Sequence, residues 1–165
     1  MVFVVCVYHE GKSLHGSEDV IRLTIRSSYG AGLMAASHGY NDAFPTLVIP
    51  IELKYGILSA EELKGYRENG GIRLKIILTI DTESVFKSLT SRDLKTPAEK
   101  TLMGHVVWLR ELLKLGFIQK VQSCDARDMS ADGHTKGSIE RQGLVDLMQG
   151  IHEFPHEVKD YIPHR

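Results

Sequence analysis

The sequence has no apolar stretch near the roughly 20 residues that a membrane-spanning helix needs. Its first residues, MVFVVCVYHEG, are too short an apolar stretch for a secretory signal and lack the basic start of one. Only two cysteines occur, Cys6 and Cys124, far apart and with no metal-ligand spacing around either, which favours two reduced thiols in strands. We therefore expect an intracellular protein, cytoplasmic or nuclear, with no membrane partner.

The chain also lacks an excess of charge of either sign, because its formal net charge is -1 over 165 residues. This excludes the strongly basic surface of a free-standing nucleic-acid binder, so any nucleic-acid contact is local or shared with a partner. A hydrophobic content of 42% is enough for one domain with its own core. We assign residues 1–150 to a single domain and residues 151–165 to a C-terminal tail.

The hydrophobic pattern predicts strands that alternate with helices. Residues 72–80 are a short apolar run that reads as a strand buried on both faces, and Asp81 stands at its carboxyl end, where sheets of this kind bind ligands. The pattern breaks at residues 41–45, and residues 46–53 are apolar and compatible with a helix. Further strands are expected at 2–8, 20–26 and 117–122, and helices at 29–38, 59–69, 82–89, 97–115 and 139–148. A capping box at Ser59 opens the second of these helices. The fourth has Gly116 as its C-cap and one apolar stripe, formed by Leu102, Val106, Leu109 and Leu113.

The tail contains His152, Glu153 and His156 in the order H-E-x-x-H, which is the zinc-protease pattern. That motif needs a helix to place both imidazoles on one face. Pro155 lies inside it and costs a helix about 3 kcal/mol. We therefore interpret these residues as an exposed tail with chance histidines and not as a zinc site.

Residues 128–133, DMSADG, match the first six positions of a calcium-binding loop. The match fails at position twelve, which is Ile139 where a bidentate glutamate is required, and Glu140 comes one residue late. A calcium site is therefore not expected here.

Asp81 and Asp132 form the third candidate, one at the end of a strand and one at the start of a helix that follows another strand. Two carboxylates at one edge of a sheet suit Mg²⁺, which prefers oxygen ligands and keeps several waters. Spacing alone leaves two alternatives open, a divalent metal site and a pair of ordinary helix caps, and caps are the commoner case.

Three segments resemble one known family in the same order along the chain. Residues 126–137, ARDMSADGHTKG, are similar to the A-D-x-x-T-K ending of the ribonuclease H domain in copia-type retrotransposon polyproteins. Residues 79–85, TIDTESV, resemble the D-N-Q-S-A segment of that family, and residues 26–33, RSSYGAGL, resemble its S-S-T-E-A-E-Y segment. The helix through residues 108–113 also stands where the family has one, so the resemblance runs from about residue 3 to residue 148.

The resemblance implies a ribonuclease H-like mixed sheet flanked by helices, and a nuclease that cleaves the RNA strand of an RNA·DNA hybrid with two Mg²⁺ or Mn²⁺ ions held by four carboxylates. It implies that Asp81 and Asp132 are catalytic metal ligands. The other two carboxylates are missing. The family's helix glutamate falls on Gly32, and its first aspartate belongs to a central strand that would precede Val2.

Loss of that strand would leave two unpaired edges facing one another, so either residues 2–8 shift to fill the gap or the sheet is split. Glu83 and Asp42 are conceivable substitute ligands, although Glu83 should point away from Asp81. Two hypotheses follow. The favoured one is a degenerate domain without catalysis, and the other is an active nuclease that takes the missing strand from another segment.

Four basic residues are expected to provide any remaining affinity for nucleic acid: Lys87, Arg92, Lys95 and Lys100. A solvated surface with no ligand is an equally good interpretation of these residues. The partners that the resemblance implies are an RNA·DNA hybrid or other nucleic acid and the reverse transcriptase region of the same element.

Overall fold

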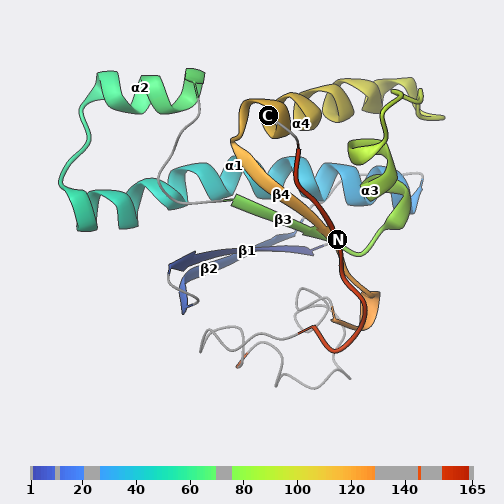
Figure 1. Ribbon diagram of the computed structural model, residues 1–165, viewed down its shortest axis with the longest axis horizontal. Coiled ribbons are helices and arrows are strands. Elements are labelled where there is room, and N and C mark those ends of the chain that lie inside the picture. The colour runs from blue at the N-terminus through green and yellow to red at the C-terminus, as the bar shows by residue number, and fades with distance from the viewer. Residues whose placement is uncertain are drawn as a thin grey trace.

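The computed structural model describes residues 2–9, 12–20, 27–69, 76–128, 145 and 154–163, the first two ranges by their backbone only. These residues form an α/β structure, as the sequence predicted (Figure 1). The strands are β1 (Val2–His9), β2 (Lys12–Val20), β3 (Ile76–Ile80), β4 (Ile118–Ser123) and β5 (Lys159–Tyr161). The helices are α1 (Ser28–Tyr55), α2 (Ala60–Asn69), α3 (Glu83–Thr90) and α4 (Met103–Leu115), with short 3₁₀ turns at Lys100–Leu102 and Ala126–Asp128.

The strands belong to two separate sheets. β1 and β2 form an antiparallel hairpin, whereas β3, β4 and β5 form a mixed sheet in that order, with β3 parallel to β4 and β5 antiparallel to it. Within the described ranges β1 and β3 each pair on one side only, and β1 does not fill the place beside β3. Helix α1 packs against both β1 and β3. One helix therefore packs against two sheets that are not paired with each other within the described residues.

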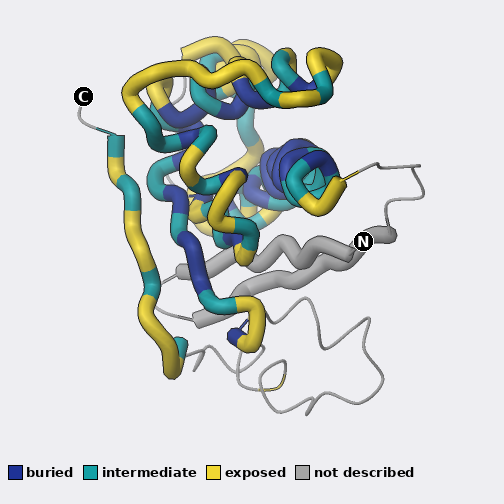
Figure 2. The backbone as a smooth tube through the Cα atoms, turned by 90° about the vertical axis from the view of Figure 1, so that its right-hand side faces the viewer, coloured by how far each residue is buried: buried dark blue, intermediate teal, exposed yellow. Residues whose placement is uncertain are grey.

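The core lies where α1, α3 and α4 cover the β3–β4 pair (Figure 2). The predicted stripe of α4 is buried: it comprises Leu102, Val106, Leu109 and Leu113. Gly116 ends α4 with φ 83°, a left-handed conformation that glycine adopts without strain, which confirms the predicted C-cap. The packing of these helices fixes the carboxyl ends of β3 and β4 next to each other.

The break predicted at residues 41–45 is wrong, because α1 continues through both Pro45 and Pro50. Each proline removes a backbone donor and costs the helix about 3 kcal/mol. The same stretch buries Phe44, Leu47 and Ile51 in the core. Burial of three large apolar side chains is worth about 1.5–3 kcal/mol each, which offsets a cost of about 6 kcal/mol for two prolines, and α1 buries further apolar residues ahead of them.

Two further boundaries differ from the prediction. The second described strand is β2 at Lys12–Val20, earlier than the predicted 20–26, because pairing with β1 already begins at Lys12, opposite His9. Helix α4 begins at Met103, six residues after Pro97, with a 3₁₀ turn before it. The predicted helix at 139–148 lies outside the described residues except for Val145, as does most of the predicted 20–26 strand.

The connection between α1 and β3 contains α2, which begins with the predicted capping box. Ser59 Oγ accepts the Glu62 backbone N–H at 3.2 Å, and a Glu62 carboxylate oxygen accepts the Ser59 N–H at 2.8 Å. No residue of α2 is buried, and Leu53 and Ile57 before it are 83% and 91% exposed. Through the described part of the chain, no helix combines the length and the apolar character that crossing a membrane requires.

Candidate functional site

Asp81 lies directly after β3, at the carboxyl edge of the mixed sheet, where the sequence placed it. Its side chain is exposed, and its Oδ1 accepts a hydrogen bond from Thr82 Oγ1 at 2.9 Å. Thr82 occupies the N-cap position of α3, but its side chain makes no cap hydrogen bond, since its hydroxyl is turned to Asp81. Asp81 is therefore held at the start of α3 and faces water.

Gly32 on α1 packs against the residues that follow Asp81. A Cβ at position 32 would lie 3.1 Å from Thr82 Oγ1 and 3.2 Å from Val85 Cγ2, which is tighter than ordinary contact. Position 32 is thus next to the Asp81 turn, where a second acidic side chain could reach the same ligand. In this chain it provides no side chain, and α1 and α3 have closed over the space that one would need.

The proposed substitutes do not take the place of the missing carboxylate. Glu83 forms ion pairs with Lys87 at 3.0 Å and Lys159 at 3.5 Å, and these partners, chiefly Lys87, lower the pKa of its carboxyl. Asp42 is ten residues beyond Gly32 on the same helix, which separates them by roughly 15 Å along the axis. Neither residue can join Asp81 around one ion in this arrangement.

Asp132, the second predicted catalytic residue, lies outside the described residues. Among the residues that are described, no three His, Cys, Asp or Glu side chains come together in a way that could hold a metal ion. Mg²⁺ needs near-octahedral oxygen coordination, and a single exposed carboxylate does not provide it. The described residues at the Asp81 edge therefore do not fit the two-ion site that the resemblance implies.

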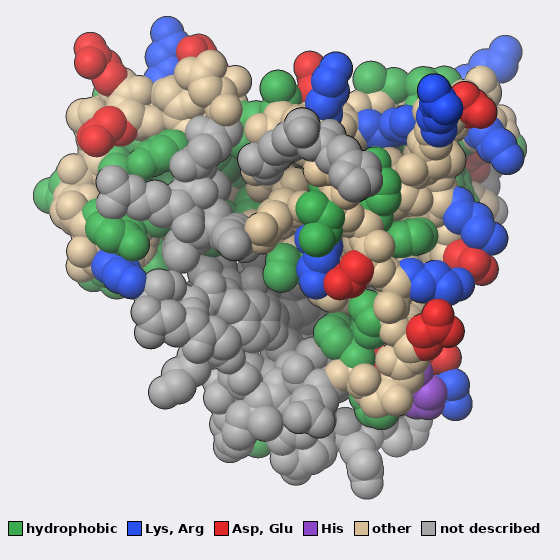
Figure 3. Space-filling model, in the orientation of Figure 1, with side chains coloured by type: hydrophobic (Ala, Val, Ile, Leu, Met, Phe, Trp, Pro, Cys, Tyr) green, Lys and Arg blue, Asp and Glu red, His purple; other side chains and the backbone are tan. Residues whose placement is uncertain are grey.

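The four basic residues proposed for nucleic acid lie on α3 and on the connection to α4. Lys87 is paired with Glu83, while Arg92, Lys95 and Lys100 are exposed. Acidic residues Asp93 and Glu99 lie in the same connection. Figure 3 shows Lys and Arg side chains interspersed with Asp and Glu on this side of the molecule, with no continuous basic surface.

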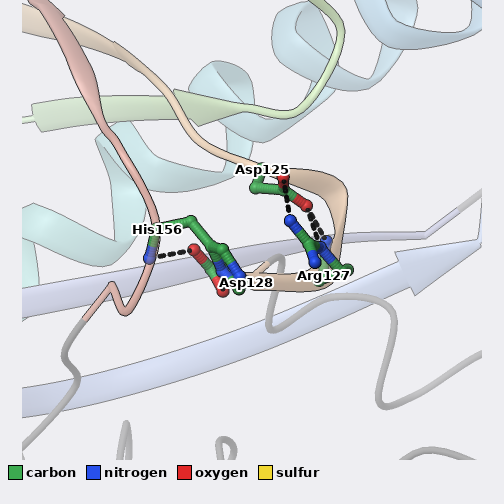
Figure 4. Close-up of polar contacts among 4 residues, drawn as sticks. All are labelled: Asp125, Arg127, Asp128 and His156. Carbon is green, nitrogen blue, oxygen red and sulfur yellow. Dashed lines mark hydrogen bonds and ion pairs between the residues drawn. The ribbon is translucent and has the colours of Figure 1, made fainter.

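Asp128 and His156 form a part-buried pair that the sequence analysis did not predict (Figure 4). The Asp128 side chain is 3% exposed and accepts hydrogen bonds from His156 Nδ1 at 2.7 Å and from the His156 backbone N–H at 3.1 Å. Asp128 closes the 3₁₀ turn after β4, whereas His156 comes from the tail. The only earlier signals were that Asp128 opens the calcium-loop match and that His156 closes the H-E-x-x-H match.

The zinc-protease geometry is not formed in the described part of this motif. Residues 155–156 form a bend and not a helix, as the presence of Pro155 predicts. The Nδ1 atom of His156 is also engaged by Asp128. The calcium-loop match loses its first ligand for the same reason, because both Asp128 oxygens accept hydrogen bonds from His156.

Asp125 and Arg127 form a second pair at this corner, shown beside the first in Figure 4. Arg127 donates from Nε and Nη2 to the two carboxylate oxygens of Asp125, each at 2.9 Å. These hydrogen bonds hold the pKa of Asp125 well below its usual range. The Asp125 carboxylate is thereby committed to Arg127 and is not a free ligand.

Cys124 lies between these carboxylates and the end of β3. Its backbone N–H donates to the Ile80 carbonyl at 3.0 Å, and its side chain is buried. Burial, with added repulsion from Asp81 and Asp128, raises the pKa of the Cys124 thiol to about 11. At pH 8 only about one such thiol in a thousand is ionised, so Cys124 is not a nucleophile.

We expect Cys124 to react at least about 100-fold more slowly with iodoacetamide at pH 8 than a free thiol does, because the thiolate is the reacting form. The rate is measured by mass spectrometry in a Cys6→Ser variant, so that one thiol remains. In denaturant the rate should rise to that of an ordinary thiol. Fast alkylation of the native chain would contradict the buried, neutral state of this cysteine.

Ser37 and His105 meet at a shallow hollow of about 380 Å³ between α1 and α4, with His105 Nδ1 3.0 Å from Ser37 Oγ. Such a contact resembles an activated serine. However, Ser37 is 2% exposed and its hydroxyl donates to the Leu33 carbonyl at 3.1 Å. Since that hydroxyl hydrogen is already used, Ser37 accepts the hydrogen bond from His105. The pair joins two helices and is not a catalytic pair.

Comparison of the chain with protein-family models, with curated proteins and with solved structures gave no match.

Proposed function

We propose that this chain is a degenerate ribonuclease H-like domain of a copia-type retrotransposon, derived from a two-metal nuclease and inactive by itself. The observation that carries the proposal is the contact between Gly32 and the turn after Asp81. The three sequence motifs predict that a carboxylate-bearing helix meets the strand-end aspartate at this point. Gly32 on α1, which has no side chain, lies against Thr82 and Val85 in the residues that follow this aspartate, and this position supports the proposal.

The split sheet supports the same proposal. A ribonuclease H-like domain without its central strand would leave β1 and β3 apart, under a helix that touches both, and the described strands are arranged in this way. A strand that paired with β1 on one side and β3 on the other would unite the two sheets. The resemblance places the first of the four carboxylates on such a strand.

Removal of ligands from a cooperative metal site abolishes most of its activity, since each carboxylate both binds the ions and offsets their charge. The remaining function that we propose is weak, local contact with an RNA·DNA hybrid or other nucleic acid through Lys87, Arg92, Lys95 and Lys100. The reverse transcriptase region of the same element is the proposed protein partner.

We expect no cleavage of a labelled RNA·DNA hybrid by this chain with either Mg²⁺ or Mn²⁺, where an active ribonuclease H serves as the positive control. Products are resolved on a denaturing gel. Metal-dependent cleavage by the unmodified chain that Asp81→Asn abolishes would refute the degenerate function.

The alternative function is an active metal-dependent ribonuclease H that obtains its missing strand from another segment. The unpaired edge of β3 favours it, because strand edges are normally covered. A fusion that adds an apolar strand ending in aspartate ahead of Met1 tests this alternative in the same cleavage assay. Cleavage by the fusion, and none by the same fusion with asparagine in place of that aspartate, would establish it.

A further inference from the structure

The segment 154–163, here called the C-terminal strap, runs along the outer side of the mixed sheet (Figure 1). Its β5 residues pair antiparallel with the end of β4, with Asp160 opposite Gln122 and Lys159 opposite Ser123. Lys159 also reaches Glu83 at the start of α3, at 3.5 Å. The strap therefore contacts β4, which pairs with β3, and the start of α3, which follows Asp81.

Polar contacts hold the strap, because no residue between 154 and 163 is buried. Asp160 accepts hydrogen bonds from Lys120 Nζ at 3.0 Å and Gln122 Nε2 at 2.9 Å. Partial burial raises the pKa of Asp160, but these two hydrogen bonds outweigh it and lower the pKa overall. Exposed polar contacts of this kind contribute little free energy, so they do not fix the strap by themselves.

The contact between Asp128 and His156 differs from the others because it is buried on the Asp128 side. A carboxylate that is 3% exposed depends on its partners, and among the described residues His156 donates to each of its two oxygens. Loss of a hydrogen-bond partner from a buried polar group leaves that group unsatisfied, which costs more than loss of a contact between exposed groups. The Asp128–His156 contact is therefore the one that holds the strap in place, and we call it the lock.

The lock also determines whether Asp128 is accessible. β3 and β4 are parallel, with Ile80 opposite Ser123, so Asp81 directly after β3 and Asp128 in the turn after β4 lie at the same end of the sheet. Asp81 is open to water, whereas Asp128 is covered by His156. Release of the strap would expose a second carboxylate at the edge that already carries Asp81.

We propose that residues 154–163 are a releasable strap, locked by the Asp128–His156 contact, that withholds the Asp128 carboxylate from the Asp81 edge of the sheet. The lock and its release depend only on the contacts described above. The ligand that Asp81 and an exposed Asp128 would bind depends on the proposed function. The strap would act as a regulatory element, because a segment of the same chain covers the Asp128 carboxylate at that edge.

The test is carbodiimide-activated labelling of carboxylates with glycine ethyl ester, read by mass spectrometry on the full chain. Asp81 is exposed and serves as the internal standard. We expect Asp128 to label at least tenfold faster relative to Asp81 in His156→Ala than in the unmodified chain. Glu157→Ala is the matched control, since Glu157 is an exposed neighbour on the same strap, and it should leave the ratio unchanged.

Amide hydrogen exchange distinguishes release of the strap from general unfolding. In His156→Ala the amides of β5 should exchange at least tenfold faster, while those of α4 keep their rates. Addition of His156→Ala to an Asp128→Asn background should give no further acceleration in β5. An unchanged labelling ratio in His156→Ala, or equal acceleration in β5 and α4, would overturn the proposal. Neither readout involves nucleic acid or cleavage, so failure here is separate from failure of the proposed function.

Discussion

Leu109→Ala is expected to lower the free energy of unfolding by about 3 kcal/mol, within the range of roughly 2–5 kcal/mol for such truncations in a core. Leu109 is fully buried on α4, at the centre of the cluster that joins α1, α3 and the β3–β4 pair. Removal of its branched end leaves a cavity that packed neighbours fill only in part. Urea denaturation followed by circular dichroism measures the change.

Leu115→Ala is the matched control, because Leu115 lies on the same helix and is 45% exposed. Leu115→Ala should lower the free energy of unfolding by less than about 1 kcal/mol, since truncation of a partly exposed side chain leaves no closed cavity. Equal losses for Leu109 and Leu115 would show that α4 does not pack on the sheet as described.

Gly32→Ala is expected to lower the free energy of unfolding by about 1 kcal/mol, although alanine favours helices. The gain in helix propensity is about 1 kcal/mol. The new Cβ would lie 3.1 Å from Thr82 Oγ1 and 3.2 Å from the buried Val85 side chain, and overpacking of this kind costs roughly 1–3 kcal/mol. The steric cost of the new Cβ therefore exceeds the gain in helix propensity. Thermal or urea denaturation measures the resulting loss of stability.

Gly65→Ala on α2 is the control with the opposite sign, because a Cβ at position 65 meets nothing within 4 Å. It should raise stability by about 0.5–1 kcal/mol. Stabilisation by both substitutions would contradict the close approach of α1 to α3.

The same contact bears on Gly32→Glu. A larger side chain at position 32 must move Thr82, whose hydroxyl donates a hydrogen bond to Asp81, so this single change should not rebuild the acidic site.

Local sequence patterns predicted the helices and strands around the core well. The stripe of α4, the glycine after it and the capping box at Ser59 were all predicted, because each depends on residues within a few positions of one another. Asp81 was placed correctly for the same reason, as the residue that ends an apolar run.

The errors occurred where distant contacts override local preference. Pro45 and Pro50 predicted an interruption, and burial of α1 against both sheets outweighs it. The Asp128–His156 pair joins residues that are 28 positions apart, and no periodicity signals such a contact. Strand β5 was missed because a three-residue exposed segment has no apolar pattern of its own.

One edge of β1 and one edge of β3 pair with no other described strand, and this has a consequence for the behaviour of the chain in solution. Through the described residues, β1 and β3 each offer a row of backbone N–H and C=O groups that no second strand satisfies. Such edges template pairing with another chain, and proteins normally blunt them with charge, proline or a bulge. β3 reads IILTI and carries none of the charges or prolines that would blunt it, so crowding at high concentration should favour edge-to-edge aggregation over the dispersed monomer.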